Sequence, residues 1–471
     1  MNYQDLIRAW FEVHRNTMVE DIKTLVRIQS DRTEPLPGMP YGEGPFRALE
    51  AAMAMCRREG FDGRLYDNRV GTANLTDLPA GLDILAHMDV VPAPAEKWTV
   101  CQPFEPIERD GKLYGRGVSD DKGPAVAALY AMACVRDLKV PMERNVRLIL
   151  GSDEECGSSD IRVYYAEEPE APMTFSPDAE FPLINCERGM FRPVITATYA
   201  EETTLPRVLE VKAGVKTNVI PDAAAAKLQG FSAAQLQTYC DAAAAATGAQ
   251  YQLSGDASEL TVTCTGVGGH AASPEAANNA LTALLSLLSA LPLAQSEGHD
   301  RLKAIAKLFP HRDWHGNALG IDMEDDVSGR LTISFDIFSY SPTALQAEAD
   351  CRCPICADKE NLVGQTNRVC EALGLTNRSQ MLIPPHYVPG DSAFVRTLLD
   401  CYETWSGETG QCIAIGGGTY VHDLKNGVAF GACFPNTDPH MHGADECAVI
   451  DELLTAGMIY ADAIIRLCGK A

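Results

Sequence analysis

The first 186 residues alternate between helical and strand-like patterns, and this alternation restricts the fold more than any other feature of the sequence. Residues 41–60 and 122–138 carry apolar side chains at helical spacing. Residues 81–91 and 143–155 contain short apolar runs that are typical of buried strands. Because alternating strands and helices build a sheet that is covered by helices, the start of the chain is predicted to be an α/β domain.

The pattern changes at about residue 187 and changes back at about residue 385. Between these points, period-two strands such as "FRPVITATYA" and "RVLEVKAG" alternate with helices rich in Ala and Leu, of which "NNALTALLSLLSAL" is the clearest. Short buried runs, "CIAIGG" and "GVAFGACF", and a closing helix follow. A chain of 471 residues exceeds the usual size of one core. We therefore predict a discontinuous domain of residues 1–186 and 385–471, with residues 187–384 inserted into it.

Composition excludes several classes of function. The net charge of −25 would repel a phosphate backbone, so nucleic acid is not expected as a partner. Nor is a membrane, since the chain has no unbroken apolar run of the roughly 18 residues that a spanning helix needs. The N-terminus lacks the pattern of a secretory signal, and the 16 cysteines are scattered in apolar contexts. These features predict a cytoplasmic protein with reduced thiols.

Five short clusters combine acids and histidines, the side chains that bind divalent metal ions. On a strand, residues two apart face the same way, so Asp89 is expected to orient the ring of His87. The clusters are His87 with Asp89, Asp120 with Asp121, Glu154 with Glu155, Asp178, and His440 with His442.

Each cluster alone also has an ordinary explanation. A His–Asp pair is common in cores, paired acids favour helix N-termini, and two histidines near a chain end are often accidental. However, His87, Asp120 and Glu155 all lie at or just beyond the C-terminal ends of apolar strand candidates. Sites of α/β sheets form at those ends, so the joint pattern favours one metal site.

Two other motifs were weighed as binding sites. The cysteines of "CRCPIC", Cys351, Cys353 and Cys356, would form half a zinc site, but a second pair at metal-ligand spacing is not nearby. The alternation of "LQAEADCRCPI" favours a strand with Cys351 and Cys353 on one face and Asp350 and Arg352 on the polar face. The run Gly416 to Gly418 lacks the Lys and Ser/Thr of a phosphate loop, so close approach to a substrate explains it better.

Taken together, "AHMDVVP", "GRGVSDDKGP", "GSDEECGS", "SPDAEFP" and "MHGADE" resemble the co-catalytic metallopeptidase family of carboxypeptidase G, aminoacylase and the ArgE and DapE deacylases. The motifs "DDKGP", "PDAEFP" and "GGGTY" are most similar to its PepV-type dipeptidases, also described as Xaa-His dipeptidases or bacterial carnosinases. The resemblance spans nearly the whole chain. It implies an α/β catalytic domain with a central mixed sheet flanked by helices, and an inserted α+β lid domain.

The resemblance also implies two zinc ions, with Mn²⁺ or Co²⁺ as alternatives, and a water that bridges them. Glu154 would be the general base for that water, and Asp89 would orient His87. His442 is preferred to His440 because it stands four residues before Glu446, as in the family's H-x-x-x-E ending. The implied metal ligands, with Asp120 shared by both ions, are His87, Asp120, Glu155, Asp178 and His442.

Further roles fall on the inserted segment and on the glycine run. His270 in "GVGGHAASPEAANNA" would stabilise the oxyanion, Asn218 would contact substrate, and Arg352 would bind a C-terminal carboxylate. Gly417 would lie against the substrate. This chain departs from the PepV-type pattern "GGGTYAR" with His422 at the Arg position, which puts its substrate range in question.

The function implied is a di-zinc dipeptidase for unblocked dipeptides, including Xaa-His or β-alanyl types. An aminoacylase-like hydrolase of N-acyl amino acids remains an alternative, and so does an inactive, metal-dependent peptide-binding protein. The partner expected is a small peptide. The insert of about 200 residues resembles the PepV-type lid, which carries two halves and supplies His270 within one chain, so a monomer is favoured.

Overall fold

A computed structural model describes residues 3–201, 203–256 and 258–470. The chain divides into two compact units. Unit 1 comprises Met1–Cys186, Tyr387–Ile413 and Gly418–Ala471, and unit 2 comprises Glu187–His386 and Ala414–Gly417. The return to unit 1 therefore falls at 386/387 rather than the expected 384/385. The short segment Ala414–Gly417, expected in the catalytic domain, belongs to unit 2.

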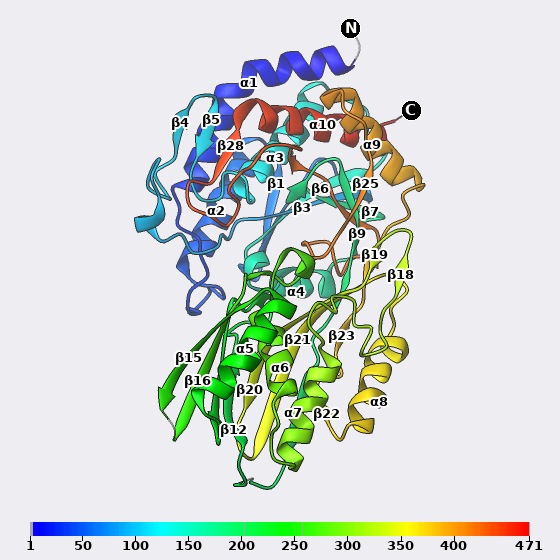
Figure 1. Ribbon diagram of the computed structural model, residues 1–471. Helices are drawn as coiled ribbons and strands as arrows, with labels where there is room; N and C mark the ends of the chain where they lie inside the picture. Colours follow the sequence, from blue (N-terminus) through cyan, green and yellow to red (C-terminus); the bar gives the residue numbers. More distant parts are fainter. Residues whose placement is uncertain (1–2, 202, 257, 471) are drawn as a thin grey trace. The chain divides into compact units, whose positions relative to one another are not determined.

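Unit 1 is built on a mixed sheet (Figure 1). Its middle strands β6, β3, β7 and β26 run parallel, whereas β1, β2 and β9 pair antiparallel at the sides. The order across the sheet is β1 (Asp62–Tyr66), β2 (Val70–Asn74), β6 (Asn145–Gly151), β3 (Ala80–His87), β7 (Met173–Ser176), β26 (Gly427–Ala429), β9 (Leu183–Glu187) and β24 (His386–Tyr387), and β25 (Cys412–Ile415) also pairs with β9.

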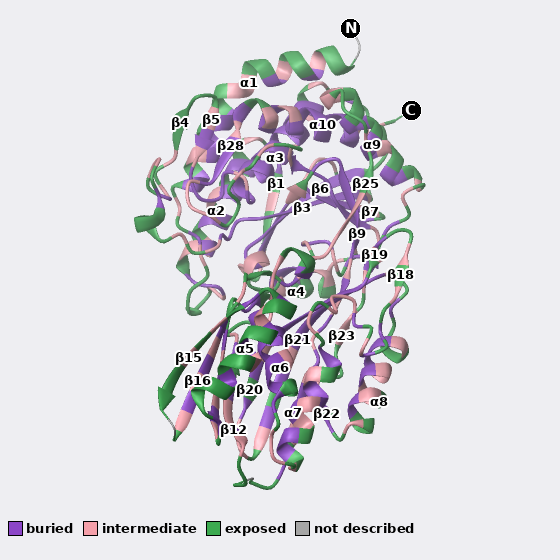
Figure 2. Ribbon diagram, viewed as in Figure 1, coloured by how far each residue is buried: buried purple, intermediate pink, exposed green. Residues whose placement is uncertain are grey.

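Alternating side chains of the central strands enter two different cores. Leu82 and Ile84 of β3 join a large cluster with the helices α1, α2, α3, α9 and α10, while Leu85 faces a smaller cluster with α4 and Tyr420. Both faces of the sheet are therefore buried, as the purple central strands in Figure 2 show. The helices are α1 (Tyr3–Val26), α2 (Glu43–Arg58), α3 (Lys122–Asp137), α4 (Ser159–Glu167), α9 (Ala393–Ser406) and α10 (Ile450–Cys468).

Unit 2 contains a second sheet, in which the pairings are antiparallel, and four α-helices in its described part (Figure 1). Period-two burial in β16 places Leu260, Val262 and Cys264 in the core that the helices share. The strands are β10 (Gly189–Phe191), β11 (Val194–Thr198), β12 (Arg207–Ala213), β14 (Ala223–Gln229), β15 (Gln250–Asp256), β16 (Glu259–Thr265), β20 (Thr332–Tyr340), β21 (Ala344–Cys353), β22 (Thr376–Asn377) and β23 (Leu382–Ile383); the helices are α5 (Ala233–Thr247), α6 (Ala280–Ala290), α7 (Glu297–Leu308) and α8 (Gln365–Ala372).

Short pairings complete both units. Unit 1 adds β4 (Ile107–Arg109), β5 (Lys112–Tyr114) and β28 (Cys447–Val449) in one small sheet, and β8 (Ala179–Glu180) with β27 (Ala432–Cys433). Unit 2 adds β13 (Val219–Ile220) with β17 (Gly269–His270), and β18 (Glu324–Asp325) with β19 (Gly329–Arg330).

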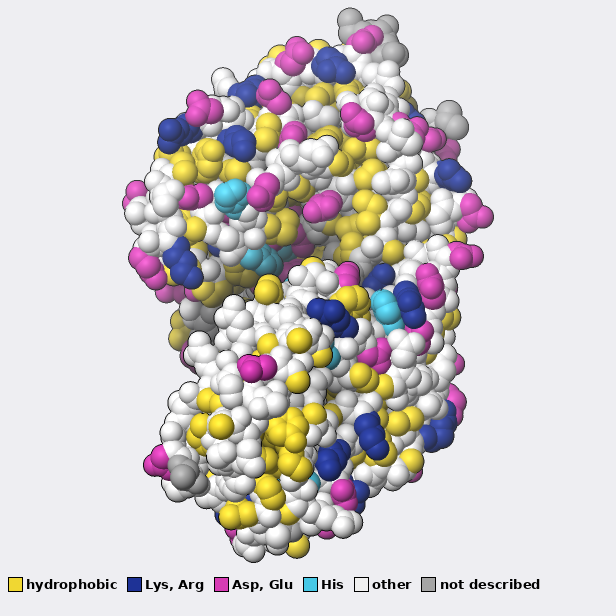
Figure 3. Space-filling model, viewed as in Figure 1, with side chains coloured by type: hydrophobic (Ala, Val, Ile, Leu, Met, Phe, Trp, Pro, Cys, Tyr) yellow, Lys and Arg dark blue, Asp and Glu magenta, His cyan; other side chains and the backbone are white. Residues whose placement is uncertain are grey.

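The predicted class of fold is confirmed: a mixed α/β sheet covered by helices, and a separate antiparallel sheet with its own helices. The strand expected at 345–355 is β21. Among the described residues, no helix is both long and apolar enough to cross a membrane. On the face shown in Figure 3, basic side chains are dispersed among acidic ones.

Candidate active site

Parallel strands bring most of the predicted metal ligands to one edge of the unit 1 sheet. His87 is the last residue of β3, Glu154 and Glu155 lie in the turn after β6, and Asp178 follows β7. The C-terminal ends of parallel strands meet at the same edge, which is where α/β sheets form their sites. Asp120 differs from the expectation, because it lies in the loop between β5 and α3 and does not end a strand of the large sheet.

Asp120 lies between two histidines that are far apart in the sequence. Its Oδ1 is 3.0 Å from His87 Nε2, and its Oδ2 is 2.8 Å from His442 Nε2. Asp178 Oδ2 lies 3.5 Å from His87 Nε2, and Glu155 Oε1 lies 3.3 Å from His442 Nε2. The structure therefore brings all five predicted ligands together. Two groups, His87–Asp120–Asp178 and Asp120–Glu155–His442, share the Asp120 carboxylate, and a third group joins His87 with Glu154 and Glu155.

The site is buried at one end and open at the other. His87 has no exposed surface, whereas 54% of the His442 side chain is exposed. The buried atoms His87 Nε2 and Glu155 Oε1 form no hydrogen bond with the described residues. A buried polar atom that lacks a partner is costly, so these two atoms are suited to a ligand from outside the chain.

The charges of this centre shift the pKa values of both histidines upward. Burial opposes protonation of His87, but Asp178 and Asp120 outweigh it and raise the pKa of the ring well above its usual value. The nearby carboxylates of Asp120 and Glu155 raise the pKa of His442 to about 10. Burial would raise the pKa of Asp120, but the two histidines lower it.

The pKa values of the other acids shift upward, in the opposite direction to that of Asp120. Burial, reinforced by repulsion among neighbouring carboxylates, raises the pKa values of Glu154, Glu155 and Asp178. Such crowding of acids disfavours their ionised forms unless positive charge is supplied. Imidazole and carboxylate groups are ligands for zinc and other first-row divalent metals. The donor set and its excess of negative charge therefore fit a pair of divalent cations.

Two acids that are not themselves predicted metal ligands, Asp89 and Asp121, accept hydrogen bonds from the backbone of the segments that carry the ligands. The carboxylate of Asp89 accepts the N–H groups of Glu154 (3.2 Å) and Glu155 (3.1 Å), while the carbonyl of Asp89 accepts a hydrogen bond from His87 Nδ1 at 3.0 Å. Asp89 Oδ1 lies 3.4 Å from that nitrogen. Asp121, which sequence analysis noted without a role, accepts the backbone N–H of His87 at 3.0 Å.

Asp160 supports the same turn from the other face of the sheet and was missed in the sequence. It accepts the N–H groups of Ser152 (2.6 Å) and Asp153 (3.0 Å), and the Tyr420 hydroxyl donates to it at 2.5 Å. A Cβ at Gly151 would lie 1.7 Å from the Tyr420 oxygen, so a larger residue does not fit there. Tyr420 is the tyrosine of "GGGTY", and nothing in that motif indicates its partner, which lies 260 residues away in the sequence.

Within unit 2, His270 lies in the two-stranded antiparallel pairing of β13 with β17, and Asn218 directly precedes β13. The N–H of Ala271 donates to the Asn218 carbonyl at 3.1 Å, and Val219 pairs with His270. His270 Nδ1 accepts the N–H of Ala272 at 3.2 Å, so the neutral ring carries its proton on Nε2. The side-chain oxygen of Asn218 is buried and has no hydrogen-bond partner among the described residues.

Arg352 is not the exposed strand charge that was weighed as its ordinary explanation. Its Nε and Nη2 donate to the two oxygens of buried Asp350 at 2.5 and 3.2 Å, and its Nη1 donates to the carbonyl of Gly416 at 2.8 Å. Arg192 Nε also donates to Asp350, at 2.9 Å. The glycine run that contains Gly417 is thus joined to Arg352 within unit 2. Asp350 was expected on the polar face and instead lies in the interior.

The remaining motifs play structural parts. Cys351 and Cys353 are buried in β21, and no cysteine of the described residues forms a disulfide. None of the metal-ligand groups among the described residues contains a cysteine. Val421 packs in the core beside Tyr420, and His422, in unit 1, donates its backbone N–H to the Thr419 carbonyl at 3.1 Å.

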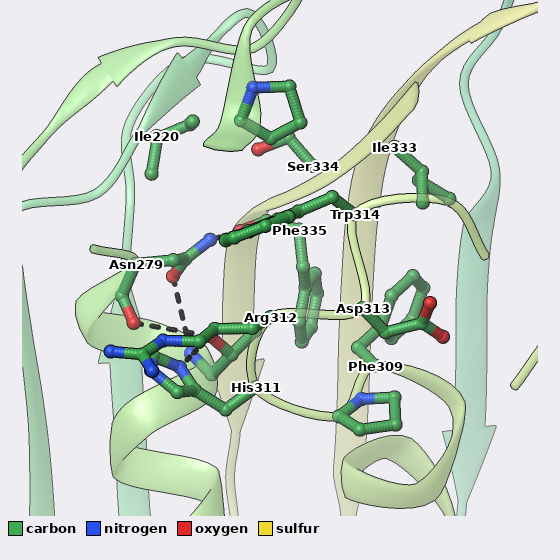
Figure 4. Close-up of a pocket in the computed structure, with 13 residues that line it drawn as sticks. Ile220, Asn279, Phe309, His311, Arg312, Asp313, Trp314, Ile333, Ser334 and Phe335 are labelled. Carbon is green, nitrogen blue, oxygen red and sulfur yellow. Dashed lines mark hydrogen bonds between the residues drawn. The ribbon is translucent and has the colours of Figure 1, made fainter. Parts of the chain in front are cut away.

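A cavity in unit 2 was also considered as a site (Figure 4). It holds about 30 Å³, room for roughly two water molecules, which is too small for a dipeptide. Its most polar part, His311, is held by Thr282 at 2.9 Å, and the side chain of Arg312 donates to the Thr247 carbonyl at 3.3 Å. We therefore regard this cavity as part of the packing of unit 2.

Comparison with known proteins decides the family. The model of peptidase family M20/M25/M40 matches residues 84–466. The chain belongs to this family. A β-Ala-Xaa dipeptidase of Lactobacillus delbrueckii subsp. lactis is 32% identical over 477 residues, which cover 99% of this chain and 98% of that protein. The chain is thus an M20 peptidase of the dipeptidase type, a hydrolase of peptide bonds from a metal-dependent family.

Solved structures share the fold of this M20 chain. Human carnosine dipeptidase 1 has a TM-score of 0.59 at 14% identity, with 99% of each chain covered. Aminoacylhistidine dipeptidase from Vibrio alginolyticus has a TM-score of 0.60 at 13% identity, with 96% of each chain covered. At such low identity these two comparisons support the fold alone.

Proposed function

We propose that this M20 chain is a two-metal dipeptidase that hydrolyses unblocked dipeptides. The observation that carries the proposal is Asp120, because its two carboxylate oxygens point to different histidines in two ligand groups. A carboxylate in that position suits a bridge between two cations. His87, Asp120 and Asp178 would hold one ion, and Asp120, Glu155 and His442 the other. Zinc is the metal that this mixture of nitrogen and oxygen donors favours.

When bound, the two ions supply a water of lowered pKa and polarise the carbonyl of the peptide bond. Glu154 would act as the general base that accepts a proton from the attacking water and then donates it to the leaving amine. Its position supports this role, since it is half-buried in one group with His87 and Glu155, and burial raises its pKa. Asp89 fixes the backbone of Glu154 through the N–H group that it accepts.

Residues of unit 2 are proposed to bind and orient the peptide. His270 presents a proton on Nε2 that can be donated to the developing oxyanion. Asn218 has an unpaired side-chain oxygen that can accept a donor of the substrate. Arg352 is held by Asp350 and binds the terminal carboxylate, with Gly417 beside it. His422 of unit 1 replaces the arginine of related motifs and sets part of the specificity.

The substrate class rests on Arg352 and on the relatives. A β-Ala-Xaa dipeptidase as a relative over nearly the full length favours β-alanyl and Xaa-His dipeptides. An aminoacylase-like activity would use the same metal chemistry and carboxylate binding but would need no free N-terminus. A peptide-binding protein without activity would have no use for a base at Glu154.

The direct test is hydrolysis by purified protein that has been stripped of metal and reloaded with Zn²⁺, Mn²⁺ or Co²⁺. The panel contains Ala-Leu, β-Ala-His, Ala-Leu amide and N-acetyl-Leu. We expect turnover of the two free dipeptides, with large losses on the amide and on N-acetyl-Leu. Preference for N-acetyl-Leu would support the aminoacylase alternative, and no turnover with any metal would reject the enzyme.

Glu154→Gln tests the general base. We expect activity to fall by about 10²- to 10⁴-fold while metal binding persists, because a positioned acid–base group contributes that much to rate. Glu180→Gln is the matched control, since Glu180 is an exposed acid two residues from Asp178. Retention of activity in Glu154→Gln would remove the base assignment and leave the metal ligands in place.

A further inference from the structure

One buried carboxylate of unit 1, that of Glu446, has no role in the chemistry proposed above, although Glu446 lies four residues after the ligand His442. Its side chain has no exposed surface. It lies where two ligand-bearing loops meet. The first loop, residues 115–121, carries Asp120 into α3, and the second, residues 438–446, carries His442 into β28.

The Glu446 carboxylate holds the first loop by its backbone. It accepts the N–H groups of Gly117 (3.1 Å), Ser119 (2.9 Å) and Asp120 (3.2 Å), the last of these being the bridging ligand itself. The main-chain oxygen of Glu446 accepts the N–H of Gly115 at 3.0 Å. A carboxylate with this many donors is fully used, so it is not available as a metal ligand.

Arg116 extends this connection to the second loop. Its Nη1 donates to Glu446 at 2.5 Å, and its Nη2 donates to the carbonyl of Gly443 at 2.8 Å, next to His442. The guanidinium lies 5.6 Å from the ring centre of Trp98 and is almost fully buried. One acid and one base therefore fix the separation of the two loops.

The second loop requires such support because its backbone is strained. His440, His442 and Asp445 have φ values of +53°, +59° and +57°. Residues other than glycine rarely adopt this left-handed region, and the surrounding structure must hold them there. Half of the His442 side chain is exposed, so packing does little to hold its ring.

The first ligand group depends much less on these loops. His87 and Asp178 come from the ends of β3 and β7, neighbouring strands of the sheet. Of the three ligands in this first group, Asp120 alone comes from the loop that Glu446 holds. In the second group, both Asp120 and His442 come from loops that Glu446 and Arg116 connect.

We propose that Glu446 is a positioning residue that sets the spacing of Asp120 and His442 and thereby determines the affinity of the second metal position. The inference rests on the proposed two-metal function. It predicts selective loss: the position of Asp120, Glu155 and His442 weakens, and the position of His87, Asp120 and Asp178 largely persists.

The test is metal titration of the full-length Glu446→Gln variant without substrate. Zn²⁺ competition against a chromophoric chelator gives stoichiometry and affinity, and Co²⁺ absorption follows filling of the two positions. We expect one ion bound with nearly wild-type affinity and the second about 10- to 100-fold weaker, the usual effect of losing a residue that supports a metal ligand. The side-chain NH2 group of Gln is a hydrogen-bond donor, so it cannot accept the backbone N–H groups that the Glu446 carboxylate accepts.

Two further variants make the result specific. Glu452→Gln is the matched control, because Glu452 accepts a hydrogen bond from Thr437 in the loop region (2.8 Å) but holds no group of the first loop. It should bind both ions as the wild type does. His442→Ala disables the second position directly, so its Co²⁺ spectrum at one equivalent should match that of Glu446→Gln.

Three outcomes are decisive. Equal weakening of both ions, or an unchanged second ion, would overturn the proposal. If Glu446→Gln fails to fold, Arg116→Lys is the deciding variant. Lysine keeps the positive charge but lacks the forked guanidinium that contacts both loops. This variant must then show the same selective loss of the second ion. A wild-type protein that binds fewer than two ions would refute the two-metal function itself.

Discussion

The substitution Asp89→Asn separates two ways in which this acid could support the metal centre. The Asp89 carboxylate accepts the N–H groups of Glu154 and Glu155 at 3.2 and 3.1 Å, and the ring of His87 bonds to the main-chain carbonyl of Asp89 at 3.0 Å. Asparagine keeps that carbonyl. The substitution should therefore disturb the turn of the two glutamates much more than the histidine.

The expected size follows from these bonds. A hydrogen bond to a charged group contributes about 1.5–3 kcal/mol, and the asparagine amide retains one acceptor oxygen for two buried N–H groups. Losing one such bond at Asp89 corresponds to a decrease of roughly 10- to 150-fold in a rate or binding constant, since 1.36 kcal/mol is a factor of ten. We expect kcat/KM for a dipeptide and the affinity of the ion held by Glu155 to fall within this range.

The assay combines steady-state kinetics at saturating metal with metal titration of the same preparation. Asp153→Asn is the control, because Asp153 accepts the Ser159 N–H (3.2 Å) in the same turn but neither glutamate N–H. A change below threefold in both kcat/KM and metal affinity would refute the reasoning. A loss confined to the ion held by His87 would show that Asp89 acts through the histidine ring instead.

Two predictions concern acids of unit 2. Burial raises the pKa of Asp336 from its usual 3.8 to about 8, so between these pH values the folded chain holds a proton that the unfolded chain releases. Stability should fall as pH rises through this window, and Asp336→Asn should gain on the wild type by at most about 1.4 kcal/mol per pH unit. Urea midpoints at pH 5, 6.5 and 8 measure this, and parallel curves would contradict it. Asp350→Asn removes the partner that holds the Arg352 fork, so KM for free dipeptides should rise about tenfold with kcat kept. Equal losses on amidated dipeptides would contradict that role.

Sequence patterns predicted the central strands well, because each is a short continuous apolar run. The predicted ranges 81–91 and 143–155 cover all of β3 but its first residue and all of β6, and the apolar side chains of both strands are buried in runs. The hairpin of β1 and β2 was missed. Its two strands have only five residues each. Because β1 also has no fully buried residue, neither its length nor its burial pattern distinguishes β1 as a strand.

The candidate site was predicted less evenly. Spacing alone suggested that Asp89 orients His87 as a residue two apart on a strand, but β3 ends at His87 and the chain then turns. The carboxylate of Asp89 thus reaches the turn after β6, which no local pattern reveals. For Asp350, alternation placed the side chain on a polar face, but Arg192 and Arg352 neutralise it in the interior. Partners so distant in sequence are not visible to a periodicity argument.

A common arrangement links these supporting acids. Asp121, Asp89, Asp160 and Glu446 each accept backbone N–H groups of segments that carry the predicted ligands, and each is buried. A buried carboxylate requires such donors, since an unpaired charge in the interior is costly. Backbone N–H groups supply part of them, and Glu446 is also paired with the guanidinium of Arg116. The ligand-bearing loops are thereby held by buried acids. Burial raises the pKa values of Asp121, Asp160 and Glu446, so divalent cations bound nearby would favour the ionised forms of these acids.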